Sequence, residues 1–182
     1  VVTANKAVIY HHGDEIFKSA KDYGVRVLFE SSVCAGTPII KLLKEELAAN
    51  KVSKISGMLN GTSNFILSNM EEGGDFDSTL KLAQEEGYAE PDPTFDIEGM
   101  DAAHKIGILS SLAFGTSLPP SDFHIEGITK IKKSDFYYAM DMGYTVKHLA
   151  VAKLHKGTVE LRAHPALINL KSHLANLKGV RK

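Results

Sequence analysis

The sequence predicts an α+β fold in which a mixed β-sheet carries helices packed on one face, preceded by a short α/β segment. Two observations favour this class. The first thirty residues alternate as strand, helix and strand, which is the pattern of a parallel sheet. Further along, residues 144–155 and 158–163 fit the two arms of a β-hairpin whose turn is Lys156-Gly157. No internal repeat or low-complexity stretch interrupts the chain after residue 30, so one α+β domain accounts for that part.

Local start and stop signals place the elements of the first half. Gly24 ends the first helix, and Thr37 followed by Pro38 fits an N-cap and a first helical residue. The turn NGTSN, which begins at Asn60, supplies capping side chains before another helix. We therefore expect strands at 1–3 and 25–29 around a helix at 14–23, a helix at 37–50, a strand at 52–59 and a helix ending near Met70.

Glycine and proline also delimit the elements of the second half. Gly87 ends a helix, and the pair Pro119-Pro120 prevents a long helix from continuing. The elements expected here are helices at 78–86 and 99–115, a strand near Ile125, a helix begun by Ser134, and the hairpin.

Composition excludes several classes of partner. The 182 residues carry a formal net charge of −1 with acidic and basic residues interspersed, so no basic stripe for nucleic acid is present. No apolar run approaches the length that spans a membrane. A single cysteine, Cys34, and the lack of a targeting segment predict a cytoplasmic protein. Because the chain opens on Val1 in what looks like a buried strand, we expect it to be part of a longer protein.

The segment 83–105, AQEEGYAEPDPTFDIEGMDAAHK, concentrates charged side chains in a loop and the start of a helix. On a helical wheel Asp101 and Lys105 continue the inward stripe formed by Ile108 and Leu112. Two interpretations stay open. Carboxylates here can bind an ammonium group while the lysine serves as a proton donor, or the two residues form an ordinary exposed ion pair at a helix start.

Two further features are weaker signals. The NGTSN turn lies where a strand gives way to a helix, so its backbone N–H groups can receive a carboxylate or phosphate, although most such turns only cap a helix. Lys6 follows a strand end, where α/β sheets bind ligands, but solvated lysines are equally common there.

Taken together, these segments resemble homoserine dehydrogenase, from VVTANKA through essentially the whole chain. The segments ESSVCAGTPII and GMLNGTSNFIL resemble the family's in the same order, and the region after Tyr144 is similar to its sheet-completing hairpin. The most specific stretch matches the family signature at Ala83, Gly87, Tyr88, Ala89, Asp92, Pro93, Asp96, Ile97, Gly99, Asp101 and Lys105.

The resemblance implies an NAD(P)-dependent oxidoreductase that interconverts L-aspartate 4-semialdehyde and L-homoserine, on the pathway to threonine, methionine and isoleucine. It implies that Lys105 and Asp101 lie at the reacting carbonyl, with Lys6 as a rival proton donor. It further implies a substrate site, a cofactor contact and a homodimer formed through the sheet. The residues implied are Glu90 and Asp96 at the substrate's amino end, Gly87 and Tyr88 in the substrate site, and Asn5 and Lys6 at the cofactor.

The resemblance also implies a site for sodium or another monovalent cation. It would draw on Glu30 and on the backbone carbonyls of Val33, Ala35 and Thr37, and such oxygen ligands suit a hard cation.

The chain departs from the family in its cofactor region. No two glycines stand in a G-x-G arrangement, so the fingerprint that seats a pyrophosphate is absent. We therefore assign residues 1–29 to a remnant of a Rossmann-type dinucleotide-binding domain and 30–182 to a catalytic domain truncated at its C-terminus. Two alternatives remain: a catalytically silent module that binds substrate or dimerises, and a semialdehyde dehydrogenase that forms a thioester through Cys34.

Overall fold

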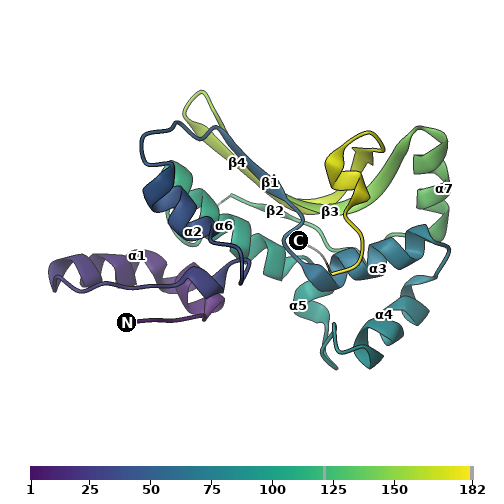
Figure 1. Ribbon diagram of the computed structural model, residues 1–182, viewed down its shortest axis with the longest axis horizontal. Helices are drawn as coiled ribbons and strands as arrows, with labels where there is room; N and C mark the ends of the chain where they lie inside the picture. Colours follow the sequence, from purple (N-terminus) through teal and green to yellow (C-terminus); the bar gives the residue numbers. More distant parts are fainter. Residues whose placement is uncertain (121, 181–182) are drawn as a thin grey trace. The chain divides into compact units, whose positions relative to one another are not determined.

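A computed structural model describes residues 1–120 and 122–180 and confirms the α+β class (Figure 1). Four strands form one sheet in the order β1-β3-β4-β2. The strands are β1 (Lys54–Gly57), β2 (His124–Ile125), β3 (Tyr144–His155) and β4 (Thr158–Asn169). The helices are α1 (Lys6–Asp22), α2 (Ile39–Lys41), α3 (Gly61–Glu71), α4 (Phe76–Glu85), α5 (Thr94–Ile97), α6 (Met100–Phe114) and α7 (Lys133–Asp141).

The sheet is mixed, as predicted. β3 and β4 are consecutive neighbours joined by a two-residue turn, and β2 pairs with β4 in parallel, with His124 opposite Arg162. In the turn, Lys156 and Gly157 both have positive φ angles, 49° and 84°. These angles match a type I′ hairpin turn, whose twist suits the two long strands. The first arm has the predicted bounds, whereas β4 extends six residues beyond the expected Ala163.

Helix α1 begins eight residues earlier than the sequence pattern indicates. Asn5 caps it, because the Asn5 side chain accepts a hydrogen bond from the backbone N–H of Val8 at 3.1 Å. The predicted start at Asp14 was therefore wrong. An N-cap asparagine three residues before an apolar residue was a local signal that could have identified the true start.

The two opening strands are reduced to one parallel bridge between Val2 and Leu28. It is held by backbone hydrogen bonds of 2.9 Å from Thr3 N–H to the Leu28 carbonyl and from Leu28 N–H to the Val1 carbonyl. Val2 is 80% exposed and Leu28 is 56% exposed. The parallel pairing was predicted, but the extent of both strands was overestimated.

The prediction of a regular helix from Thr37 to Asn50 was also wrong. Helix α2 covers only Ile39–Lys41 and passes into a π-helical turn over Leu42–Glu46. Thr37 makes no N-cap; instead the carboxylate of Glu30 accepts the N–H groups of Ile40 and Lys41, each at 2.9 Å. A residue ten positions away thus satisfies N–H groups that a local cap would otherwise bind.

The chain divides into two compact units. Unit 1 comprises residues 1–55, 104–123 and 151–161, and unit 2 comprises residues 56–103, 124–150 and 162–182. Buried apolar side chains of α3, α4, α7, β3 and the intervening loops form a hydrophobic core within unit 2. Its members are Ile66, Leu67, Met70, Ala83, Ala89, Ile128, Phe136, Ala139 and Val146.

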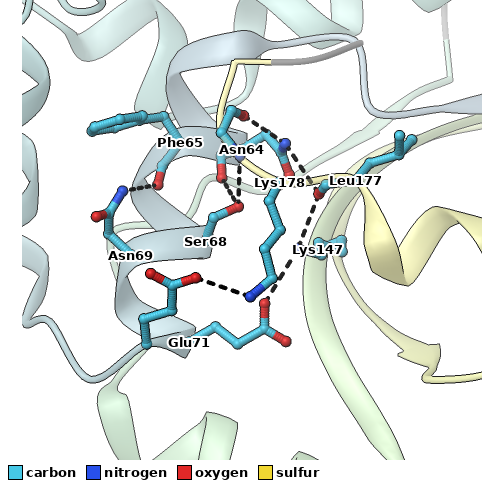
Figure 2. Close-up of polar contacts among 10 residues, drawn as sticks. Asn64, Phe65, Ser68, Asn69, Glu71, Lys147, Leu177 and Lys178 are labelled. Atoms are coloured by element: carbon cyan, nitrogen blue, oxygen red, sulfur yellow. Dashed lines mark hydrogen bonds and ion pairs between the residues drawn. The ribbon is translucent and has the colours of Figure 1, made fainter.

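Within unit 2, polar side chains of α3 hold the segment that follows β4 (Figure 2). The Asn64 amide nitrogen donates to the Gly179 carbonyl at 2.7 Å, and the Gly179 N–H donates to the Ser68 hydroxyl at 3.2 Å. Lys147, on β3, donates to the Leu177 carbonyl at 3.3 Å. These contacts fix the last described residues against the helix that begins at the NGTSN turn.

Candidate functional site

Two carboxylates of the predicted site are joined by one amide group. The Nδ2 of Asn60 donates to Oδ1 of Asp96 at 2.7 Å and to Oδ2 of Asp101 at 2.9 Å. Asn60 is 6% exposed and Asp101 is 5% exposed. All three residues belong to unit 2. The two bonded carboxylate oxygens lie no more than about 6 Å apart, because both lie within hydrogen-bond distance of one nitrogen.

The amide orientation of Asn60 follows from its partners. Asn60 is the N-cap of α3, and its Oδ1 accepts the backbone N–H of Ser63 at 2.7 Å. A flipped amide would set its oxygen against two carboxylates and its NH2 group against an N–H donor. Only the orientation found here pairs every donor with an acceptor. The hydroxyl of Ser63 adds a bond of 3.0 Å to the backbone carbonyl of Asp96.

A glycine turn brings Asp96 and Asp101 to the same place. Helix α5 ends just before Gly99 and α6 begins just after it, and Gly99 has φ +84°. A Cβ atom there would lie 3.0 Å from Nε2 of His148 and 3.1 Å from the Glu126 carbonyl oxygen. Glycine is therefore required both for the backbone angle and for the close packing against β3.

Tyr88 and Gly87 lie in the loop that joins α4 to this cluster. Gly87, with φ +75°, ends α4, and the Tyr88 N–H closes the helix end on the Ala83 carbonyl at 2.8 Å. The Tyr88 carbonyl accepts the buried hydroxyl of Thr62 at 2.7 Å, and the Tyr88 ring lies 5.0 Å from that of Phe65. The loop is thus fixed to the start of α3, while Tyr88 as a whole is 41% exposed.

The other carboxylates of the signature are more exposed than Asp101. Glu90 is exposed, and its backbone carbonyl accepts a hydrogen bond from the Gln84 amide at 3.3 Å. The side chain of Asp92 accepts the Thr94 N–H at 3.1 Å at the start of α5. Hydrogen bonding from Thr94 lowers the pKa of Asp92. Asp92 therefore shapes the loop, and Asp96 and Asp101 are the pair that the structure brings together.

The two candidate proton donors belong to unit 1. Lys105 is half-buried and follows Asp101 by one turn of α6. Lys6 is half-buried and is the first residue of α1. Asn5, the predicted cofactor contact, uses its side-chain oxygen to cap that helix. The interpretation of Asp101 and Lys105 as an exposed surface pair was wrong for Asp101, which is buried and bonded to Asn60.

Asn60 is a residue of the cluster that sequence reasoning did not assign. The sequence identified the NGTSN turn as a helix cap, and the Oδ1 atom of Asn60 does cap α3. Its second role depends on Asp96 and Asp101, 36 and 41 residues further along the chain. No local pattern signals that pairing.

Hydrogen bonds already engage part of the loop that is predicted to bind a cation, residues 30–37. Both oxygens of the Glu30 carboxylate accept backbone N–H groups, and the Thr37 carbonyl accepts the Ile39 N–H at 2.7 Å. Within residues 1–120 and 122–180, no backbone N–H group donates to the carbonyls of Val33 and Ala35. No cluster of three or more metal-binding side chains occurs in that part of the chain either. A monovalent cation here would therefore rest chiefly on backbone carbonyls.

Comparisons with solved structures define the class of protein. A crystal structure of a homoserine dehydrogenase from Thiobacillus denitrificans is 49% identical, with a TM-score of 0.95 over 99% of this chain and 42% of that chain. A hyperthermophilic archaeal homoserine dehydrogenase in complex with NADPH is 32% identical, with a TM-score of 0.82 over 98% of this chain and 51% of that chain. The fold is that of a region of these dehydrogenases.

Sequence comparison gives the family. The homoserine dehydrogenase family model matches residues 38–182, and the chain belongs to that family. The Pseudomonas aeruginosa homoserine dehydrogenase is 51% identical over 99% of this chain, and that of Neisseria gonorrhoeae is 52% identical over the same share. The chain spans 42% of the length of each of these two relatives. No helix among the described residues is long and apolar enough to cross a membrane.

Proposed function

We propose that the chain is the substrate-binding region of an NAD(P)-dependent oxidoreductase that interconverts L-aspartate 4-semialdehyde and L-homoserine in the cytoplasm. The observation that carries the proposal is the pair of carboxylates, the half-buried Asp96 and the buried Asp101, joined by Asn60 within the family signature. Two carboxylates held this close favour binding of a cationic group, because the cation relieves their mutual repulsion. An amino-acid substrate brings an ammonium group of that kind.

Each residue has a role in this proposal. Asp96 and Glu90 hold the amino end of the substrate, with Tyr88 and Gly87 shaping the loop around it. Lys105 gives a proton to the carbonyl oxygen, which becomes the hydroxyl of homoserine, and Asp101 precedes that lysine by one turn of α6. The nicotinamide cofactor supplies the hydride when it is bound. Lys6 is the alternative proton donor.

The residues present do not by themselves make a seat for that cofactor. The chain has no G-x-G turn, and Asn5 at the start of α1 is engaged in capping the helix. We therefore expect the 182-residue chain to bind NADPH far more weakly than the protein extended to the length of its relatives. Calorimetric titration of both proteins tests this, and equal affinities would contradict it.

The identity of the proton donor can be tested in the protein extended to the length of its relatives, called the extended protein below. Lys105→Ala should lower kcat by roughly 10²- to 10⁴-fold, the usual size of a general-acid contribution. Lys105→Arg should not restore it, because arginine keeps the charge but does not readily give up a proton. Loss of activity in Lys6→Ala with normal turnover in Lys105→Ala would assign the proton to Lys6. If neither variant loses rate, the proposed site is wrong.

Two competing functions can be weighed against this proposal. A silent substrate-binding or dimerising module would bind homoserine but show no turnover even in the extended protein. A thioester mechanism at Cys34 has less support, because Cys34 is only 8% exposed and its reaction requires access to the thiol. We also propose a homodimer formed through the sheet. Leu167 on β4, which is 52% exposed, supports that proposal.

A further inference from the structure

Asn60 is placed to do more than cap a helix. Its oxygen satisfies the Ser63 N–H at the start of α3, and each N–H of its nitrogen is directed to a different carboxylate, one before and one after the Gly99 turn. Capping requires only the oxygen, and serine or aspartate caps a helix equally well. The two donated bonds are what distinguishes asparagine at this position.

We propose that Asn60 is a positioning residue that fixes the separation of the Asp96 and Asp101 carboxylates. This inference rests on the proposed function, in which Asp96 holds the substrate's amino end and Asp101 acts beside the proton donor. One rigid amide then links the carboxylate that binds the substrate's amino end to the carboxylate beside the substrate's reacting carbonyl. The distance between those two points determines which length of amino-acid aldehyde fits.

The surroundings of Asn60 support this role. Because the amide is 6% exposed, its hydrogen bonds to the carboxylates face little competition from water. The charged groups that face it are Asp96 from α5 and Asp101 from α6, while β3 places His148 against the Gly99 turn. Donated hydrogen bonds favour the ionised form of a carboxyl group, and the neighbouring negative charge opposes it. Asn60 therefore offsets a repulsion that the fold itself creates.

Two substitutions separate positioning from capping. Asn60→Ser keeps a good helix cap, but its side chain is too short to reach both carboxylates. It should lower kcat/KM by on the order of 10- to 100-fold, since small misplacements of reacting groups have effects of that size. Asp75→Ser is the matched control, because Asp75 caps α4 through the Ser78 N–H in the same unit and contacts neither carboxylate. It should leave kcat/KM unchanged.

Asn60→Asp gives the sharper readout. It keeps the capping oxygen but adds a third carboxylate beside Asp96 and Asp101, so one of the three should become protonated more easily. A protonated carboxyl donates a hydrogen bond again. The activity of Asn60→Asp relative to the unmodified protein should therefore rise as the pH falls, while that of Asn60→Ser should stay constant with pH.

The measurements are steady-state rates from pH 6 to 9 with homoserine and NADP, in the protein extended to the length of its relatives. Absence of turnover in the unmodified protein would refute the proposed function. If the unmodified protein turns over substrate and both Asn60 variants match Asp75→Ser, the positioning role alone is refuted. Equal, pH-independent losses of kcat/KM in Asn60→Ser and Asn60→Asp would likewise refute the positioning role, because Asn60 would then act only by holding the structure together.

Discussion

The Nζ of Lys147 lies 3.5 Å from Oε2 of Glu71, and the lysine side chain is completely buried while that of Glu71 is 13% exposed (Figure 2). Burial lowers the pKa of Lys147, and the negative charge of Glu71 offsets this only in part. The next residue, Glu72, forms a second pair with Lys178 at 2.9 Å, but both of these side chains are more than half exposed. The two neighbouring pairs allow a direct comparison of a buried and an exposed ion pair.

We predict that Glu71→Gln lowers the free energy of unfolding of the chain by on the order of 3 kcal/mol, because it leaves the Lys147 cation buried without a counter-charge. Glu72→Gln should cost under about 1 kcal/mol, as is usual for an exposed pair. Adding Lys147→Met to Glu71→Gln should recover part of the loss, since the buried charge is then absent. Urea unfolding of the four proteins measures these differences, and equal costs for the two glutamates would contradict the argument.

The buried His148 predicts a loss of stability in acid. Its Nε2 contacts the Glu126 carbonyl at 2.9 Å, and burial lowers its pKa below the ordinary value of 6.5. The unfolded chain therefore binds a proton more readily than the folded chain as the pH falls below about 6.5, which favours unfolding. Above that pH the contribution of His148 to stability is complete.

His148→Gln keeps a donor for the Glu126 carbonyl but does not titrate. Its free energy of unfolding should fall less than that of the unmodified chain between pH 7.5 and 5.5. The exposed His155, replaced in the same way, serves as the control and should leave the pH dependence unchanged. Parallel curves for the unmodified chain and His148→Gln would show that His148 does not contribute.

Gly99 and Gly87 form a matched pair for testing the turn between α5 and α6. Both have positive φ angles, 84° and 75°, so alanine is strained by roughly 1 kcal/mol or more at either position. Only at Gly99 would the new Cβ meet other atoms, whereas at Gly87 nothing lies within 4 Å. Gly99→Ala should therefore lower the free energy of unfolding by about 1 kcal/mol more than Gly87→Ala. Equal losses of unfolding free energy in the two variants, measured by thermal or urea unfolding, would mean that His148 and Glu126 move to accommodate the added methyl group.

The cation prediction is tested by salt dependence. Monovalent cations should raise the activity of the extended protein, and Glu30→Gln should weaken that response. A glutamine side chain has only one carbonyl oxygen for the two N–H groups that Glu30 now binds, so the loop that carries the Val33 and Ala35 carbonyls would shift. Glu46→Gln, at an exposed glutamate nearby, should behave like the unmodified protein. An unchanged salt response in Glu30→Gln would remove the site from this loop.

Several features could be predicted because neighbouring residues determine them. The Lys156-Gly157 turn, the end of α4 at Gly87 and the extent of α6 within one residue at each end all follow from local conformational preferences. The inward stripe of α6 follows from helical periodicity, and it correctly placed Asp101 among buried residues. The spacing of the signature also sufficed to predict the family.

Only the tertiary structure decided which polar groups meet. Glu30 caps a helix ten residues away, which displaced the predicted cap at Thr37, and Asn60 finds its carboxylates 36 and 41 residues further on. The burial of Lys147 on β3 likewise depends on tertiary packing and not on its neighbours in the sequence. Turns and helix ends depend on backbone angles that a few adjacent residues set, whereas these pairings depend on which segments the packed core brings together.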